Sequence, residues 1–323
     1  MDDVALFRSL KSIHQDLVGS VGTVVVGQPQ VVGEMLVALF SEGHCLFVGV
    51  PGLAKTLLVS TLAQAVGLKF GRIQFTPDLM PSDITGTDVL EEDRATGRRE
   101  FRFVQGPVFT NLLLADEINR TPPKTQAALL QAMQERHVTA SGRTWRLDSP
   151  FLVFATQNPI EQEGTYPLPE AQQDRFMFSI PVGYPTRPEE EEIVRRTTVS
   201  EMPVAPRVID LEKLVAIQQL IRKTPINPDV IAYAVRIASA TRPGSGVDAT
   251  RWLRWGAGPR ASQFLAVGAR TVAALDGRLV PDPADVRAVA NAVLRHRVLL
   301  NFEAEAAGVT PDQVVASIVE EVG

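Results

Sequence analysis

The feature that most constrains this chain is an apolar run at residues 44–49, followed by glycines and then by a helix-like stretch at residues 56–66. A buried strand that leads through a glycine loop into a helix is the usual first unit of an α/β sheet. Three more strand-like runs alternate with helical segments such as residues 122–136, and they lie at residues 111–115, 151–156 and 178–182. The alternation predicts a mostly parallel sheet covered by helices on both faces.

Two segments interrupt this alternation and are typical of β-hairpins. Residues 89–104 and 137–148 carry Thr96-Gly97 and Ser141-Gly142 between short strand-like flanks. Glycine dipeptides of this kind mark tight turns. We expect both hairpins to be insertions into the α/β core.

The chain changes character after Tyr184-Pro185, where strand signals end and helix-start signals recur. Thr186 and Glu189 have the spacing of a capping box. Three further helix starts pair a capping residue with proline, at Asn227-Pro228, Asp282-Pro283 and Thr310-Pro311. We therefore predict an α/β core at residues 1–184, with an N-terminal helix, and a helical domain at residues 185–323.

Composition excludes several classes of protein. The 32 basic and 37 acidic residues leave a net charge of −5, and no five basic residues are consecutive, so tight binding to nucleic acid is not favoured. The single cysteine, Cys45, excludes an internal disulfide and a multi-cysteine zinc site. The N-terminus lacks the pattern of a secretory signal, and no apolar run is long enough for a membrane span, so we expect a cytoplasmic protein without membrane insertion.

The glycine loop after the first predicted strand matches the phosphate-binding P-loop pattern at every fixed position except one, where Ala54 replaces the last glycine. Small residues let backbone N–H groups wrap phosphates, a lysine reaches the β and γ oxygens, and a hydroxyl binds Mg²⁺. The loop consists of Gly49, Val50, Pro51, Gly52, Leu53, Ala54, Lys55 and Thr56. The pattern predicts binding of a nucleotide with Mg²⁺.

Polar side chains follow two of the other predicted strands. Asp116 and Glu117 end the run that begins at residue 111, and they suit a metal-binding aspartate and a water-activating glutamate. Asn158 follows the run at residues 151–156, where its amide could orient the attacking water. Two plainer interpretations stay open: a solvated strand end for the carboxylates, and an ordinary turn for Asn158-Pro159.

Taken together, these motifs resemble the MoxR-type AAA+ ATPases. The resemblance covers most of the chain after about the first 20 residues, and it includes residues 103–108, 116–126, 155–159, 168–176 and 256–261. It implies an α/β core with a five-stranded parallel sheet and hairpin insertions, a C-terminal helical lid, and a homo-oligomeric ring, expected to be a hexamer, with active sites between subunits.

The resemblance also implies roles for individual residues. Arg175 would be an arginine finger inserted into the neighbouring subunit, with Arg120 as a competing candidate. Arg260 would be the second sensor, reaching the γ-phosphate of its own subunit. The remaining roles are Lys55 and Thr56 as the Walker A pair, Asp116 and Glu117 as the Walker B pair, Asn158 as the first sensor, Thr56 and Asp116 as Mg²⁺ ligands, and Gly27 and Gln28 beside the adenine.

The leading functional hypothesis is that ATP hydrolysis drives remodelling or maturation of a protein partner, which the resemblance suggests could carry a von Willebrand factor A domain. One alternative is a nucleic-acid motor of the helicase and magnesium-chelatase group, with Arg143 and Arg146 contacting phosphates. Another is a slow nucleotide-gated binding switch. Residues 241–256 match no expected lid pattern and are left unassigned.

Overall fold

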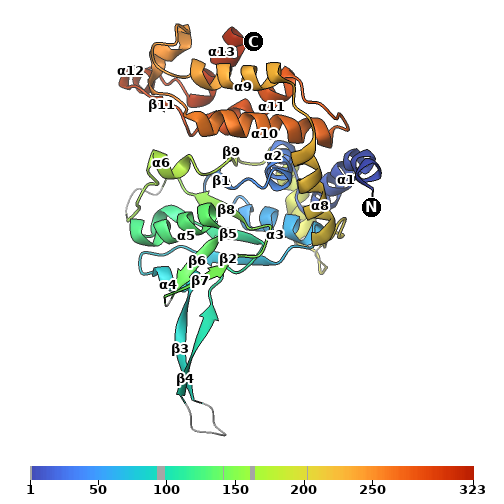
Figure 1. Cartoon of the computed structure of the whole chain (residues 1–323), viewed down its shortest axis with the longest axis vertical. Coiled ribbons are helices and arrows are strands. Elements are labelled where there is room, and N and C mark those ends of the chain that lie inside the picture. Colours follow the sequence, from blue (N-terminus) through green and yellow to red (C-terminus); the bar gives the residue numbers. More distant parts are fainter. Residues whose placement is uncertain (1, 93–98, 141, 161–163, 202) are drawn as a thin grey trace.

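The computed structural model describes the chain except residues 1, 93–98, 141, 161–163 and 202. An α/β layer occupies the middle of Figure 1, a helical layer lies above it, and a long hairpin projects below. No helix of the described residues is both long and apolar enough to cross a membrane.

The central sheet has five parallel strands in the order β2-β5-β8-β1-β9. Its strands are β1 (Cys45–Val48), β2 (Phe70–Gln74), β5 (Leu112–Asp116), β8 (Leu152–Gln157) and β9 (Phe178–Pro181). The predicted parallel sheet is confirmed. Four strands match predicted runs, whereas β2, at one edge, was not recognised in the sequence.

Alternate side chains of the sheet enter two separate cores, as the period of a strand requires. In β5, Leu112 and Leu114 belong to the core shared with the helical layer, whereas Leu113 and Ala115 face the opposite core. The first core is covered by α1 (Asp3–Val24), α2 (Pro29–Phe40) and α3 (Lys55–Ala65). The second is covered by α5 (Pro123–Glu135). Helices on both faces were predicted and are confirmed.

Both predicted hairpins are present. The strands β3 (Gly86–Glu92) and β4 (Arg99–Gln105) pair antiparallel and follow the short helix α4 (Pro81–Thr85). The second hairpin pairs β6 (His137–Ala140) with β7 (Arg143–Arg146). The turn expected at Thr96-Gly97 and the position of Ser141 lie outside the described residues. Phe103 of the first hairpin stacks on Trp145 of the second, with ring centroids 4.5 Å apart, so the hairpins contact each other.

The C-terminal part is mainly helical, as predicted. Its helices are α7 (Arg187–Thr197), α8 (Leu211–Lys223), α9 (Pro228–Ala240), α10 (Pro259–Leu275), α11 (Pro283–Leu294), α12 (Phe302–Ala306) and α13 (Pro311–Val322). The capping box at Thr186 and the three proline starts are confirmed. This part also contains a short strand pair that was not recognised in the sequence, because β10 (Leu253–Trp255) pairs antiparallel with β11 (Leu299–Leu300). The domain division at residue 184 stays a prediction.

Three short helices complete the fold. They are the 3-10 helix η1 (Ile118–Arg120), α6 (Glu170–Gln173) and the 3-10 helix η2 (Asp248–Trp252). The helix η1 directly follows β5, whose last residue is Asp116, and α6 directly precedes Asp174 and Arg175.

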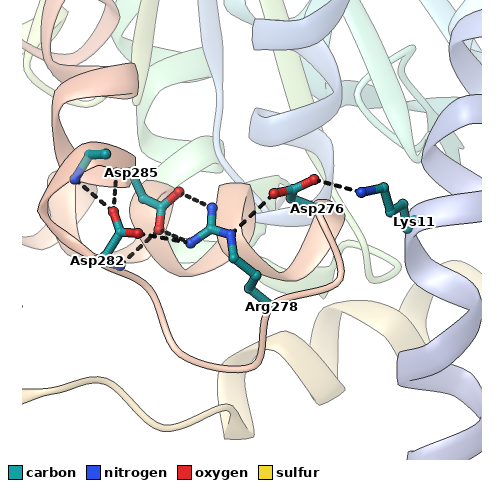
Figure 2. A network of polar contacts seen from close by, with 6 residues as sticks. Lys11, Asp276, Arg278, Asp282 and Asp285 are labelled. Atoms are coloured by element: carbon teal, nitrogen blue, oxygen red, sulfur yellow. Dashed lines mark hydrogen bonds and ion pairs between the residues drawn. The ribbon is translucent and has the colours of Figure 1, made fainter.

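A chain of ion pairs ties α1 to the loop between α10 and α11 (Figure 2). Lys11 of α1 donates to Asp276 at 3.1 Å, and Arg278 donates to the same carboxylate at 3.1 Å. Arg278 also binds both oxygens of Asp285 at 2.8 and 2.5 Å. Asp282 caps the start of α11 and accepts from Arg278 at 3.3 Å. Because the Asp285 side chain is only 3% exposed, its pair with Arg278 compensates a buried charge.

Candidate functional site

A cavity of about 400 Å³ lies at the carboxyl ends of the central strands. This edge of an open α/β sheet is where ligands usually bind. The lining residues come from the glycine loop, from the start of α3 and from the ends of β2, β5 and β8: Pro51, Gly52, Leu53, Ala54, Lys55, Thr56, Leu57, Arg72, Asp116, Glu117, Thr156 and Asn158. Most residues of the predicted site therefore converge on one cavity.

Local backbone geometry explains the small residues of the glycine loop. A Cβ at Gly49 would lie 2.5 Å from the carbonyl oxygen of Val182, directly after β9, so only glycine fits there. Gly52 has a φ of +85°, which favours glycine. Ala54 adopts the left-handed conformation, with φ 54° and ψ 22°, directly before α3. Alanine therefore keeps the loop geometry at this position, at a strain cost of roughly 1 kcal/mol.

Backbone carbonyl groups of the glycine loop hold the Lys55 side chain. Its Nζ donates to the carbonyl oxygens of Gly49 and Val50, both at 2.7 Å. Burial lowers the pKa of Lys55, while the nearby carboxylates of Asp116 and Glu117 act in the opposite direction. The ammonium group is therefore partly desolvated beside the cavity, which strengthens its attraction for an anion.

Asp116, the last residue of β5, has two firm partners. Its Oδ1 accepts a hydrogen bond from the Thr156 hydroxyl at 2.7 Å, and its Oδ2 pairs with the Arg72 guanidinium at 2.7 Å. Thr156 also accepts a hydrogen bond from the backbone N–H of Glu117 at 2.8 Å. Thr156 of β8 thus fixes the end of the neighbouring strand and the orientation of the Asp116 carboxylate.

Glu117 adopts a left-handed conformation, with φ 55°, that non-glycine residues seldom use. Such strain is found most often at functional sites. Its Oε2 accepts hydrogen bonds from Gln74 at 2.9 Å and from Arg120 at 3.1 Å. The turn directs Glu117 away from the line of β5, so the two adjacent carboxylates have different partners while lining one cavity.

The cavity contains oxygen ligands that fit Mg²⁺. The Thr56 hydroxyl and the Asp116 carboxylate both line it, and Asp116 already attracts a cation, the Arg72 guanidinium. Among the described residues there is no cluster of three or more His, Cys, Asp or Glu side chains that could hold a metal by itself. This pattern suits Mg²⁺, which is usually held by one or two protein oxygens together with substrate phosphates and water.

Asn158 lies in a turn and also lines the cavity. Its side chain is part of a turn, because Oδ1 accepts a hydrogen bond from the backbone N–H of Ile160 at 3.1 Å. The residue is only 4% exposed, yet it lines the cavity together with the glycine loop. The turn therefore holds the amide in place beside the cavity.

Arg175 and Arg260 lie outside the lining of this cavity. Arg260 donates instead to Oδ2 of Asp174 at 2.6 Å, and Arg297 donates to Oδ1 of the same carboxylate at 2.8 Å. Arg175 directly follows Asp174 and is partly exposed, and no ion pair holds it within the described part of the chain. Arg260 therefore contacts Asp174 in this structure, and its expected role at the γ-phosphate of its own subunit stays a prediction.

Arg297 anchors this junction between the two layers. Its side chain is 2% exposed, and its guanidinium donates to the carbonyl oxygens of Asp174, Phe176 and Met177 at 2.8, 2.5 and 3.2 Å. Burial lowers the pKa of Arg297 to about 10, against the opposing effect of Asp174. A second cavity of about 550 Å³ lies beside this junction and is lined in part by Asp174, Trp255 and Arg297.

The remaining predicted site residues, Gly49, Gly27 and Gln28, do not line the cavity. Gly49 packs against Val182, as described above. Gly27 has a φ of +70° and lies against the Glu189 side chain. Gln28 donates to the carbonyl oxygen of Gly183 at 2.9 Å. The adenine contact expected for Gly27 and Gln28 stays a prediction.

Three polar residues of the site were not identified from the sequence: Arg72, Gln74 and Thr156. Arg72 and Thr156 line the cavity, and Gln74 binds Glu117. A weak signal was present in β2, because Ile73 is buried and its two polar neighbours therefore share the opposite face of the strand. Thr156 lies within an apolar run, where a single hydroxyl gives no signal of its own.

Comparison with known proteins assigns both layers to described families. The profile of the "ATPase family associated with various cellular activities (AAA)" matches residues 44–178. The profile of the "AAA lid domain" matches residues 249–318.

Relatives and a solved structure extend the match over nearly the whole chain. The chain is 48% identical to the chaperone MoxR1 of Mycobacterium tuberculosis, covering 93% of this chain and 79% of the relative. It is 40% identical to the uncharacterised protein YeaC of Bacillus subtilis, with 94% and 92% covered, and 34% identical to MoxR of Paracoccus denitrificans, with 89% and 88% covered. The crystal structure of an inferred ATPase of Cytophaga hutchinsonii is similar, with a TM-score of 0.91, 41% identity and coverage of 99% of this chain and 97% of that one.

Proposed function

Because this chain belongs to the MoxR family of AAA+ ATPases, we propose that it hydrolyses ATP and uses the energy to remodel or mature a partner protein. The observation that carries the proposal is the cavity in which Lys55, Thr56, Asp116, Glu117 and Asn158 converge. Its volume of about 400 Å³ is within the range of small-molecule sites. A relative named as a chaperone supports the part of the proposal that concerns a protein client.

The proposed mechanism assigns a task to each residue. Backbone N–H groups of the glycine loop bind the phosphates, and Lys55 leaves the loop carbonyls to neutralise the β and γ oxygens. Thr56 and Asp116 would hold Mg²⁺, which supplies charge neutralisation at the phosphates. Glu117 accepts a proton from the attacking water, and the Asn158 amide orients that water.

We propose that Arg175 acts on the nucleotide of a neighbouring subunit in a homo-hexameric ring, and that Arg260 acts as the second sensor of its own subunit. Arg175 lies outside the cavity of its own subunit and directly follows Asp174, the residue whose carboxylate pairs with Arg260. An arginine from outside the site can neutralise charge that develops on the γ-phosphate. An isolated subunit should therefore hydrolyse ATP slowly.

Complementation between two inactive variants tests this arrangement. Glu117→Gln should bind ATP without turnover, while still offering Arg175 to its neighbour. Arg175→Ala should keep an intact cavity and lack the arginine that the next subunit needs. A mixture of the two should regain part of the ATPase activity. Arg187→Ala, which removes a fully exposed guanidinium on α7, is the control and should behave as wild type.

Two results would reject the proposal. Normal turnover by Glu117→Gln would remove the catalytic assignment. Recovery of no activity in mixed rings, with both variants assembled and binding ATP, would remove the role of Arg175 across the interface. Arg120, which contacts Glu117 of its own subunit, would then be the next arginine to replace.

The client is the second part of the proposal. The ATP-bound Glu117→Gln ring should retain its partner, so affinity capture with this variant should enrich one protein over the Arg187→Ala control. A partner with a von Willebrand factor A domain would agree with the family resemblance. A cytoplasmic location for both proteins stays a prediction.

One observation keeps the nucleic-acid alternative testable. Arg143 and Arg146 are exposed on the β7 strand of the second hairpin. ATPase activity that rises with DNA, and that loses this rise in Arg143→Ala, would favour a nucleic-acid motor. Turnover that stays very slow with and without a client would favour a nucleotide-gated switch.

A further inference from the structure

Arg72 is a cation of the nucleotide cavity that the family motifs do not include. It lies on the edge strand β2, in register with Leu114 of β5. Its guanidinium pairs with Oδ2 of Asp116 at 2.7 Å, and the same nitrogen donates to Oε1 of Gln74 at 2.8 Å. The side chain thus crosses from β2 to the carboxylate expected to hold Mg²⁺.

The two oxygens of Asp116 have separate partners. The Thr156 hydroxyl donates to Oδ1, and the positively charged Arg72 guanidinium pairs with Oδ2. Mg²⁺, or a water bound to it, needs the same carboxylate from the Thr56 side of the cavity. Two cations that require one carboxylate compete for it, because each neutralises the charge that attracts the other.

The exposure of the pair makes such competition reversible. The Asp116 side chain is 13% exposed, so it loses much of its hydration and gains from a counter-ion. The Arg72 side chain is 47% exposed, so it can leave for water or for the phosphates without stranding a buried charge. Because Arg72 lines the cavity, its long side chain can reach either the Asp116 carboxylate or phosphates bound in the cavity.

We propose that Arg72 is a positioning residue that holds Asp116 as a counter-ion and gives up this carboxylate when Mg²⁺ and ATP bind. Arg72 thereby limits how strongly Mg²⁺ increases the affinity for the nucleotide. Before Mg²⁺ binds, it also neutralises the negative charge of the Asp116 carboxylate. The inference rests on the proposed function, since the exchange requires a cavity that binds ATP with Mg²⁺.

The test measures a ratio of affinities. Calorimetry gives the dissociation constant of the non-hydrolysable analogue AMP-PNP in excess EDTA and again with Mg²⁺, and the first divided by the second is the metal enhancement. In Arg72→Ala, the free Asp116 charge repels the metal-free nucleotide and attracts Mg²⁺. Both effects raise the enhancement, by about fivefold for a pair of this exposure.

Three further variants make the result specific. Arg72→Lys retains a charge near Asp116 and should keep most of the wild-type ratio. Arg187→Ala, which removes an exposed guanidinium that does not line the cavity, should leave the ratio unchanged. In an Asp116→Asn background, Arg72→Ala should change the ratio less than about twofold, because the partner is already gone.

The outcomes separate the inference from the proposed function. An enhancement that Arg72→Ala leaves unchanged or lowers, with AMP-PNP still bound, overturns the inference alone. A rise that persists in the Asp116→Asn background also overturns it, because the effect would not pass through this pair. No binding of AMP-PNP by the wild-type protein overturns the proposed function and the inference together. If Arg72→Ala does not fold, Arg72→Gln replaces it with a neutral side chain of similar length.

Discussion

His44, directly before β1, makes the stability of this protein depend on pH. Its Nδ1 accepts a hydrogen bond from the backbone N–H of Val153 at 2.9 Å, so the ring joins the start of β1 to β8. Burial lowers the pKa of His44 to about 4, with a further lowering by Arg136, while the Met133 carbonyl acts in the opposite direction. A proton on Nδ1 would also remove the acceptor that Val153 requires.

The sign and size of the effect follow from this pKa. In the unfolded chain His44 gains a proton near pH 6.5, whereas in the folded protein it stays neutral down to about pH 4. Between these values the unfolded state binds more protons, so the free energy of unfolding falls as the pH falls. The gap corresponds to roughly 3 kcal/mol, at about 1.4 kcal/mol per pH unit.

Urea unfolding from about pH 7 to about pH 4 measures this contribution. The matched variant is His44→Asn, whose amide oxygen can accept from Val153 without titrating. The wild type should lose roughly 3 kcal/mol more than the variant over this range. The buried His296, whose pKa burial also lowers, is present in both proteins and cancels in the comparison. A wild-type-minus-variant difference that stays constant with pH would refute the reasoning.

Three other changes should alter stability measurably in urea unfolding. Ala54→Gly should stabilise by roughly 0.5 kcal/mol, because relief of left-handed strain exceeds the added freedom of the unfolded chain; a loss of stability would contradict this. Arg278→Ala should cost about 2 kcal/mol by leaving a buried carboxylate uncompensated, and Lys11→Ala, in an exposed pair of the same network, should have a much smaller effect. Equal effects would argue against burial as the cause. Gly256→Ala should cost more than about 2 kcal/mol, because its Cβ would collide with a backbone carbonyl, whereas Gly258→Ala meets nothing within 4 Å and serves as the control.

The parts of this fold that depend on local chemistry were predictable from the sequence. The glycine loop, the helix starts with proline and the two hairpins each depend on residues a few positions apart. The strand β2 was missed because only Ile73 of its five residues is buried, as expected for an edge strand. The pair β10 and β11 was missed because strands of three and two residues are too short to show a periodic pattern.

The cavity was predictable to the extent that its residues belong to motifs. Lys55, Asp116, Glu117 and Asn158 each follow or precede a recognisable run, and parallel strands bring such positions to one edge. Arg72 had no motif, and its role depends on the pairing of β2 with β5. The position of Arg260 depends on how α10 packs against the core, which a spacing pattern does not encode.

The ion pairs of Arg260 and Arg297 with Asp174 couple two parts of the molecule. Both arginines belong to the helical layer, and the residue they hold is joined by one peptide bond to Arg175. A rotation of that layer that keeps both ion pairs would therefore also move the Arg175 backbone. In the proposed ring, the tilt of each helical layer would set how far Arg175 reaches toward the adjoining subunit.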